Sequence, residues 1–316
     1  MDVLDDLLAG TRARGGVFNQ TVLDPPWSLL IADEATLALA TMIRGDAWLL
    51  FEGAEPIRLR ERDIAVIRGP VRYVVADDPG TAPRLLIKPN GVCEPLPGAT
   101  EHDGPSLGPR THGRRPDGQD LLVSGVYQMK SDVSRRLLAA LPPVLVVPAD
   151  QVAGPVMDLL TAEISRDDPG QQVVLDRWLD LALIITLRAW FARPESKAPG
   201  WYQAQGDPVV GQALRLIHED PARGWTVAEL ADRCGASRAN LARRFSALVG
   251  AAPMAYLTGW RITLAADLLR DTDDTVESIA RKVGYANAFA LSVAFKRIRG
   301  ISPSAHRKGE ALASSA

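Results

Sequence analysis

A pattern of about 50 residues occurs twice towards the end of the chain, and this repeat constrains the fold more than any other feature of the sequence. The first copy places Thr226, Gly235, Phe245, Gly250 and Pro253 where the second places Thr275, Gly284, Phe295, Gly300 and Pro303. A helical solenoid needs at least about three units to bury a continuous core. Two copies with a long helical segment between them therefore argue against a solenoid.

Each copy predicts a short helix, a glycine turn and a longer basic helix. Thr226 and Thr275 are placed to cap the short helices, and Ser237 and Asn287 to cap the long ones. Apolar residues recur at helical spacing in both long segments, so that each presents one face to a core. Two helices joined by a tight glycine turn, of which the second is longer and basic, are typical of a helix-turn-helix.

The distribution of charge favours DNA as the partner of this region. Residues 207–308 carry 15 Lys and Arg against 10 Asp and Glu, whereas the rest of the chain carries 21 against 28. The basic excess thus lies on the module that would face phosphates. Paired helical hairpins also occur as plain core structure, and the charge is what separates the two interpretations.

Three stretches resemble the DNA-binding domain of the AraC/XylS family of bacterial transcription regulators. They are WTVAELADRCGASRANLARRF (225–245), PMAYLTGWRITLAADLL (253–269) and IARKVGYANAFALSVAFKRIRGISP (279–303). The resemblance covers about 100 residues and implies two helix-turn-helix units held by a central helix. Their recognition helices would lie about one DNA turn, roughly 34 Å, apart on one face of the duplex.

The resemblance also implies which residues face DNA. Base-facing positions fall on Ala239, Asn240 and Arg243 in the first recognition helix and on Ala288, Phe289 and Val293 in the second. Arg243 suits bidentate contact with a guanine edge, and Asn240 suits adenine or a phosphate, whereas the second set cannot make bidentate hydrogen bonds. We expect the first unit to specify the sequence and the second to anchor through phosphates and thymine methyl groups. The full expected set is Ser237, Arg238, Ala239, Asn240, Arg243, Arg244, Asn287, Ala288, Phe289, Val293, Lys296 and Arg297.

The N-terminal part predicts a different class of structure. After a short amphipathic helix in residues 1–10, short apolar runs separated by turns extend to about residue 88, which is typical of an antiparallel sandwich or barrel. This part resembles the cupin-like effector domain of some AraC-type regulators. The stretches that carry the resemblance are VLDDLL (3–8), RGGVF (14–18), PWSLLI (26–31), MIRGDAWL (42–49) and RDIAVIRG (62–69).

Histidine usage argues against a metal-dependent cupin. Such sites use two or three histidines and a glutamate, but residues 1–101 contain no histidine, and Ala40 and Arg72 stand where ligands would be expected. We therefore expect a binding pocket for a small-molecule effector, with no cofactor and no enzymatic activity. The candidate effector-binding residues are Trp27, Leu39, Trp48, Arg72 and Tyr73. The alternative is that such residues merely fill the barrel.

A Gly/Pro-rich loop over 89–118 contains Cys93, His102 and His112. These side chains are candidates for a metal site or for a redox-reactive thiol. Their spacing matches no metal motif, so a solvated hairpin loop is the favoured interpretation. The remaining cysteine, Cys234, is expected to be a packing residue, and two cysteines in all indicate a reducing compartment.

After a last strand over 121–129 the chain is expected to turn helical, with helices at about 150–165 and 170–192. The second of these has a broad apolar surface that fits a homodimer interface, although it could instead pack on its own barrel. The most apolar segment, 179–191, is interrupted by Asp180 and Arg188 and is shorter than the ~20 residues of a spanning helix. With an acidic N-terminus, we expect a cytoplasmic protein without a membrane partner.

The sequence thus predicts a multidomain α+β protein. We expect a cupin-like barrel over 1–130, a helical dimerisation segment over 131–192, a linker over 193–206 and an all-α DNA-binding domain with two helix-turn-helix units over 207–310. The predicted function is sequence-specific transcription regulation with a barrel that senses a small molecule or oxidant. Expected partners are double-stranded DNA, RNA polymerase, the effector and a second copy of the chain. The alternatives are a cupin-type metalloenzyme fused to a helical domain and a non-specific architectural DNA binder.

Overall fold

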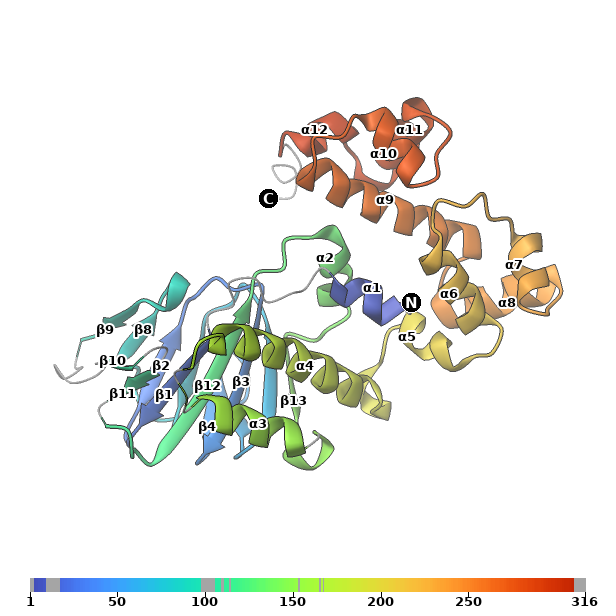
Figure 1. Cartoon of the computed structure of the whole chain (residues 1–316). Coiled ribbons are helices and arrows are strands. Elements are labelled where there is room, and N and C mark those ends of the chain that lie inside the picture. The colour runs from blue at the N-terminus through green and yellow to red at the C-terminus, as the bar shows by residue number, and fades with distance from the viewer. Residues whose placement is uncertain are drawn as a thin grey trace. The chain divides into compact units, whose positions relative to one another are not determined.

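The computed structural model describes residues 3–9, 18–97, 106–108, 111–113, 115–152, 154–164, 166 and 168–309 (Figure 1). The chain forms two compact units. The helical unit draws on the N-terminal helix, on residues 130–140 and on the chain from residue 197 onward. The sheet unit contains the remaining residues up to 196.

The sheet unit consists of two β-sheets that share one apolar core. The seven-stranded sheet has the order β10-β11-β1-β12-β3-β6-β13, and the six-stranded sheet has the order β5-β4-β7-β2-β8-β9. The first comprises β1 Phe18–Leu23, β3 Leu37–Arg44, β6 Ile64–Arg68, β10 Ser106–Gly108, β11 Thr111–Gly113, β12 Asp120–Tyr127 and β13 Val144–Val147. The second comprises β2 Ser28–Ile31, β4 Ala47–Leu50, β5 Ile57–Leu59, β7 Tyr73–Ala76, β8 Leu85–Ile87 and β9 Cys93–Pro95.

Neighbouring strands pair antiparallel except for β1 with β11 and β2 with β8, which pair parallel. Because side chains alternate along a strand, β3 directs Ala38 and Ala40 to the shared core and Leu39 to the outer face. The predicted β-rich N-terminal domain is confirmed.

Helices α3 Gly154–Ile164 and α4 Gln171–Phe191 lie across the outer face of the seven-stranded sheet (Figure 1). The Tyr127 hydroxyl donates a hydrogen bond to the Leu179 carbonyl at 2.6 Å. A Cβ atom at Gly125 would lie 2.4 Å from a methyl carbon of Leu179, so glycine is what lets the helix approach the strand. The two helices expected at about 150–165 and 170–192 are therefore present, and α4 packs on its own sheet.

Strand β13 corrects the expectation that the chain is helical throughout after residue 129. It pairs antiparallel with β6, for example Val146 with Ala65. Pro142 and Pro143 end the preceding helix, and the short apolar run that follows completes the sheet as its edge.

The helical unit contains both expected helix-turn-helix units, α7–α8 and α10–α11, with the long helix α9 between them. Gly284 in the second turn has a φ of +83°, and an added Cβ would lie 2.4 Å from the Ala222 carbonyl oxygen, so only glycine fits there. The helices are α1 Val3–Ala9, α2 Asp132–Ala139, α5 Gly200–Gln203, α6 Val210–Glu219, α7 Val227–Arg233, α8 Arg238–Val249, α9 Pro253–Asp271, α10 Val276–Lys282, α11 Ala288–Arg299 and α12 Pro303–Arg307.

The units divide the chain differently from the expected domain boundaries. Helix α2 was expected to belong to a dimerisation segment over 131–192, but it packs against α1 and α9 in the helical unit. Residues 193–206, expected as a linker, contain the short helices η3 Pro194–Ser196, α5 and η4 Ala204–Gly206. Two further 3-10 turns, η1 Pro89–Gly91 and η2 Ala149–Gln151, lie in the sheet unit.

Replacing Tyr127 with Phe tests the attachment of α4 to the sheet. The substitution removes a buried hydroxyl that bonds a backbone carbonyl of α4, so we expect the free energy of unfolding of the sheet unit to fall by about 1 kcal/mol. Chemical denaturation followed by tryptophan fluorescence measures the change. Val71→Ala, at an exposed position of the sheet unit, should change stability by less than about 0.5 kcal/mol. Equal midpoints for the two variants would contradict the proposed role of the hydroxyl.

Candidate nucleic-acid interface and ligand cavity

Helix α8 presents a basic surface because its apolar residues face inward. Leu241 and Phe245 are fully buried, which leaves Arg238, Ala239 and Arg243 exposed on the opposite side. The Ser237 hydroxyl accepts a hydrogen bond from the Asn240 N–H at 3.2 Å and so caps the helix.

Two side chains of α8 have partners within the unit. The Arg243 guanidinium donates to the Asn240 side-chain oxygen at 3.1 Å, one turn earlier, so the two residues that were expected to read bases lie together on the exposed face. Arg244 forms an ion pair with Asp207. Burial opposes ionisation of Asp207, but the Val210 N–H and Arg244 outweigh it and hold the pKa of this carboxyl below its usual range. Arg244, expected at the DNA interface, thus serves first to attach α8 to the start of α6.

Helix α11 presents apolar side chains where α8 presents polar ones. Phe289 is 78% exposed and Val293 is 54% exposed, while Leu291 and Phe295 form the buried face. Asn287 caps the helix by accepting from the Ala290 N–H at 2.9 Å.

The first turn of α11 has a second anchor, since the Glu277 carboxylate of α10 accepts from the Ala288 N–H at 2.7 Å. Lys296 and Arg297 are exposed in the last turn. The second recognition helix therefore exposes a short apolar patch, with two basic side chains in its last turn.

A buried charge cluster attaches α2 to the helical unit. The side chain of Asp132 is only 1% exposed, and its carboxylate accepts from Arg299 at 2.6 Å and from Arg270 at 3.3 Å. In the reverse direction, the Asp267 carboxylate of α9 accepts from the Asp132 N–H at 2.6 Å and the Val133 N–H at 3.1 Å. These four residues, Asp132, Asp267, Arg270 and Arg299, are called the Asp132 cluster below.

Aromatic contacts reinforce the attachment. The Arg136 guanidinium of α2 lies 5.4 Å from the ring centres of both Tyr256 and Trp260. The Tyr256 hydroxyl also bonds His218 at 2.8 Å, and the other ring nitrogen of His218 bonds Asp6 of α1. Burial raises the pKa of Tyr256 to about 12. Sequence reasoning missed this whole arrangement, because Asp132 and Asp6 carry no local signal of their partners.

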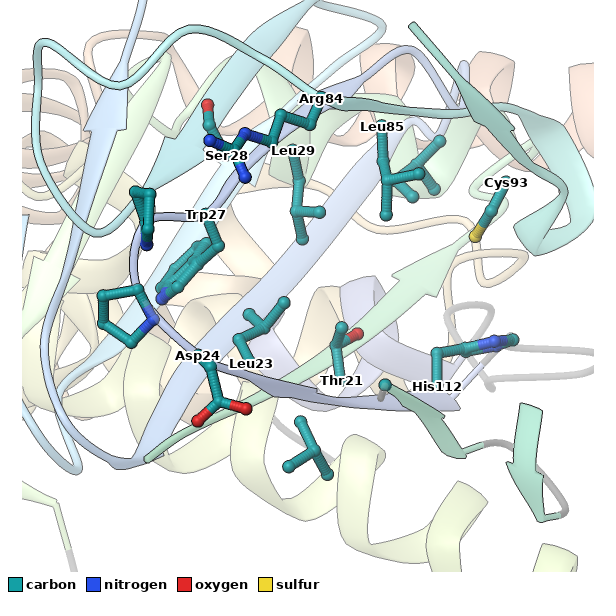
Figure 2. A pocket seen from close by; sticks show the side chains of 15 residues that line it. Thr21, Leu23, Asp24, Trp27, Ser28, Leu29, Arg84, Leu85, Cys93 and His112 are labelled. Carbon is teal, nitrogen blue, oxygen red and sulfur yellow. The ribbon is translucent and has the colours of Figure 1, made fainter. Parts of the chain in front are cut away.

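Two adjoining cavities open in the sheet unit and share the side chains of Cys93 and His112. The first is lined by Trp27, Leu29 and Leu85 (Figure 2). The Trp27 N–H donates to the Asp120 carboxylate at 2.7 Å, which fixes the indole. The second extends between the sheets. Its lining includes Asn19, Ile31, Asp33, Ala38, Ala40, Tyr73, Val75, Lys88, Leu122, Ser124 and Val126.

Of the five candidate effector-binding residues, two line the cavities and three do not. Trp27 and Tyr73 line the cavities, as expected. Leu39 and Trp48 do not face inward: Leu39 is buried on the outer side of β3, and Trp48 lies beneath Arg58, 6.0 Å from its guanidinium carbon. Arg72 is exposed. The expectation of inward orientation was wrong for these positions because the alternation was placed one residue out of phase.

Cys93 and His112 lie at the same end of the first cavity (Figure 2), whereas His102 lies outside the described residues. Burial raises the pKa of the Cys93 thiol and lowers the pKa of His112, so both are neutral near pH 7. A neutral thiol is a poor nucleophile. No cluster of three or more potential metal ligands occurs among the described residues. Burial also raises the pKa of Cys234, which is half-buried.

Within the described part of the chain, no helix has both the length and the apolar character needed to cross a bilayer.

Comparison with known proteins gives matches over nearly the whole chain. Residues 2–192 match the family described as Cupin, and residues 230–309 match the family described as Helix-turn-helix domain. An AraC-like transcription regulator from Streptomyces lividans is 36% identical over 98% of this chain and 98% of its own. Another, from Streptomyces antibioticus, is 34% identical over 98% of this chain and 99% of its own. A solved structure of the DNA-binding domain of AdpA with a target DNA is 33% identical over 33% of this chain and 93% of that chain, with a TM-score of 0.32.

Replacing Asn287 with Ala tests how firmly the first turn of α11 is held. The change removes the acceptor for the Ala290 N–H, so the turn should fray at a cost of about 1 kcal/mol. Amide hydrogen exchange within α11 would show faster exchange at Ala290. Ser292→Ala, one turn further along the same helix, is the control and should leave the exchange of that first turn unchanged. Equal exchange in both variants would mean that Glu277 alone holds the turn.

Proposed function

The chain belongs to the family of AraC-like transcription regulators, and we propose that α8 reads the bases of its target DNA while α11 anchors the protein on the duplex. The observation that carries the proposal is the contrast between the exposed faces of the two recognition helices. Helix α8 exposes Arg243 beside Asn240, two side chains able to bond base edges. Helix α11 exposes Phe289 and Val293, which offer only apolar contact.

The chemistry of the major groove connects this contrast to distinct roles. A bidentate arginine distinguishes guanine from the other bases, and this discrimination is worth about 1–3 kcal/mol. An apolar side chain contacts thymine methyl groups but has no donor or acceptor to satisfy, so it discriminates less. Lys296 and Arg297 at the far end of α11 suit phosphate contacts, which hold the protein without selecting a sequence.

Two substitutions separate reading from anchoring. Arg243→Ala should lower the preference for a selected genomic site over competitor DNA by about tenfold or more, because it removes a base contact. Val293→Ala should weaken binding to all sequences about equally. Affinities measured by fluorescence anisotropy at several salt concentrations check both expectations. Arg60→Ala, an exposed arginine of the sheet unit outside α3 and α4, is the control for loss of positive charge.

The outcomes also separate the alternatives. If Val293→Ala weakened binding to one sequence alone, the anchoring role of α11 would be excluded. If the wild-type protein bound all fragments with the same steep salt dependence, the protein would be an architectural DNA binder. Stoichiometric metal in the purified protein, together with turnover, would support the metalloenzyme alternative instead.

We propose further that the cavities of the sheet unit hold a small-molecule effector. Their walls combine apolar side chains with a few polar groups, as ligand sites do. The raised pKa of the Cys93 thiol favours a bound molecule over an oxidant as the signal. RNA polymerase is the proposed partner through which the bound regulator changes transcription.

A second copy of the chain is the proposed partner of the outer surface of α3 and α4. In α3, Leu159 is 65% exposed. In α4, Val173 is 61% exposed, and Val174 and Leu181 are also exposed. These apolar side chains lie outside the contact between α4 and its own sheet. Homodimers are the commonest assemblies of soluble proteins. Analytical ultracentrifugation tests this one: the wild type should sediment as a dimer, and Leu181→Glu should shift the protein towards the monomer.

Helix α2 is the proposed route from the effector to the DNA-binding helices. Strand β12 lines the second cavity with Leu122, Ser124 and Val126, and the chain passes from the end of β12 into α2 within a few residues. The Asp132 cluster then joins α2 to α9 and to the end of α11. A ligand that displaces β12 would therefore act on an element docked against the second helix-turn-helix unit.

Asp132→Asn tests this route. The amide keeps the shape of the side chain but leaves Arg299 without its buried counter-charge, whereas Arg270 keeps Asp267 and Asp271. The docking of α2 should therefore weaken. We expect its amides to exchange at least about tenfold faster, corresponding to about 1.4 kcal/mol, while the amides of α4 keep their protection. Asp150→Asn, at an exposed position, is the matched control. Unchanged exchange in α2 would show that its apolar contacts suffice for docking.

A further inference from the structure

We propose that the effector is a small amphipathic amine, with an apolar body in the second cavity and an ammonium group that pairs with Asp33. This inference rests on the proposed sensing function of the sheet unit and deepens it by naming the class of ligand. Three observations support it: the composition of the cavity wall, a tyrosine hydroxyl at that wall with no protein partner among the described residues, and the balance of charge around the cavity.

The wall of the second cavity is mainly apolar. Leu29, Ile31 and Val75 come from the six-stranded sheet, and Leu122 and Val126 come from β12 of the seven-stranded sheet. Most of these side chains also belong to the shared core, so they are held in place by packing. A ligand gains affinity here by burying an apolar body between the sheets.

The polar end of the cavity contains Asp33 and Tyr73. Tyr73 is only 7% exposed, yet its hydroxyl has no hydrogen-bond partner among the described residues, and its ring stacks on Phe51. Burial and then the charge of Asp33 raise the pKa of Tyr73, so the hydroxyl stays a neutral donor and acceptor near pH 7. The hydroxyl lies at the wall of the second cavity and can bond a polar group of a ligand there.

Asp33 is a carboxylate without a cationic partner among the described residues. Its carboxylate accepts hydrogen bonds only from backbone groups, the Ala35 N–H at 3.1 Å and its own N–H. Burial raises the pKa of this carboxyl above its usual range, since few groups compensate its charge. A ligand ammonium would supply the missing partner, and a charge-assisted hydrogen bond in a partly desolvated site is stronger than its neutral equivalent.

The other ionisable groups of the cavity do not offset this preference. Lys88 pairs with Glu94 at 2.6 Å, so its charge is already balanced. Cys93 and His112 are neutral, because burial raises the pKa of the thiol and lowers the pKa of the imidazole. Among the described lining residues, the uncompensated charge is thus the negative one of Asp33. A carboxylate ligand would be repelled, and an alcohol would gain a hydrogen bond without ion pairing.

Titration calorimetry of the full chain with three matched probes tests the proposal. The probes are phenethylamine, phenethyl alcohol and phenylpropionate, which share an aromatic body and differ in the charge of one end. We expect the amine to bind at least about tenfold more tightly than the alcohol, as a charge-assisted hydrogen bond predicts, and the carboxylate to bind most weakly. Asp33→Asn should remove the preference for the amine and leave the affinity for the alcohol nearly unchanged. Asp117→Asn, whose side chain is 79% exposed, is the control.

Dependence on pH gives an independent readout with the unaltered protein. Because the ammonium binds the ionised carboxylate, amine affinity should fall as the pH falls through the pKa of Asp33, which lies above the usual range for an aspartate. The alcohol should show no such change. Tyr73→Phe should weaken both the amine and the alcohol, since it removes a hydroxyl that faces either ligand.

The binding results separate failure of the amine proposal from failure of the proposed effector-sensing and DNA-binding functions. Equal binding of all three probes, with no effect of Asp33→Asn, would overturn the amine class but leave the cavity as an effector site. Absence of binding by every probe would overturn both the amine class and the choice of cavity. DNA selectivity measured on the same samples without probe would stand in either case, because it depends on α8.

Discussion

Strand β12 is buried on both faces, and the arrangement of the sheet unit depends on this constraint. One face supplies Leu122 and Val126 to the cavity between the sheets, and the other carries Gly125 and Tyr127 against α4. Because successive side chains of a strand point to opposite sides, a shift of one residue would exchange the two sets. The register that lets α4 approach at Gly125 therefore also fixes the wall of the cavity.

The attachment of α2 differs in kind from the packing of β12. An apolar contact tolerates small sliding movements. A buried carboxylate that contacts several guanidinium groups, as Asp132 contacts Arg135, Arg270 and Arg299, is stable only when its partners are in place. The Asp132 cluster also uses backbone groups, since Asp267 bonds the first N–H groups of α2. Docking of α2 on α9 is thus specific in position.

The parts of the site that could be predicted are those whose signals are local. The caps Ser237 and Asn287 and the turn glycine Gly284 each act within a few residues, so the helix-turn-helix units could be located before the fold was known. The phase of the barrel strands could not be set in this way. In β3 both faces are buried, so its apolar residues show no alternation with polar ones, and Leu39 was placed on the wrong side. The predicted secondary structure of the short run in β13 was wrong for a related reason, because four apolar residues fit a strand or a helix equally well.

The sequence by itself determined the two helix-turn-helix units, the capped recognition helices with their contrasting exposed residues, and a β-rich N-terminal domain. The tertiary structure alone decided that α1 and α2 join the helical unit, that Cys93 and His112 meet at one cavity, and that Asp33 and Tyr73 form its polar end. The physical reason is distance along the chain. A cap is encoded within one turn of a helix, but Asp132 and Arg299 are 167 residues apart, and their contact exists only once all the intervening elements have packed.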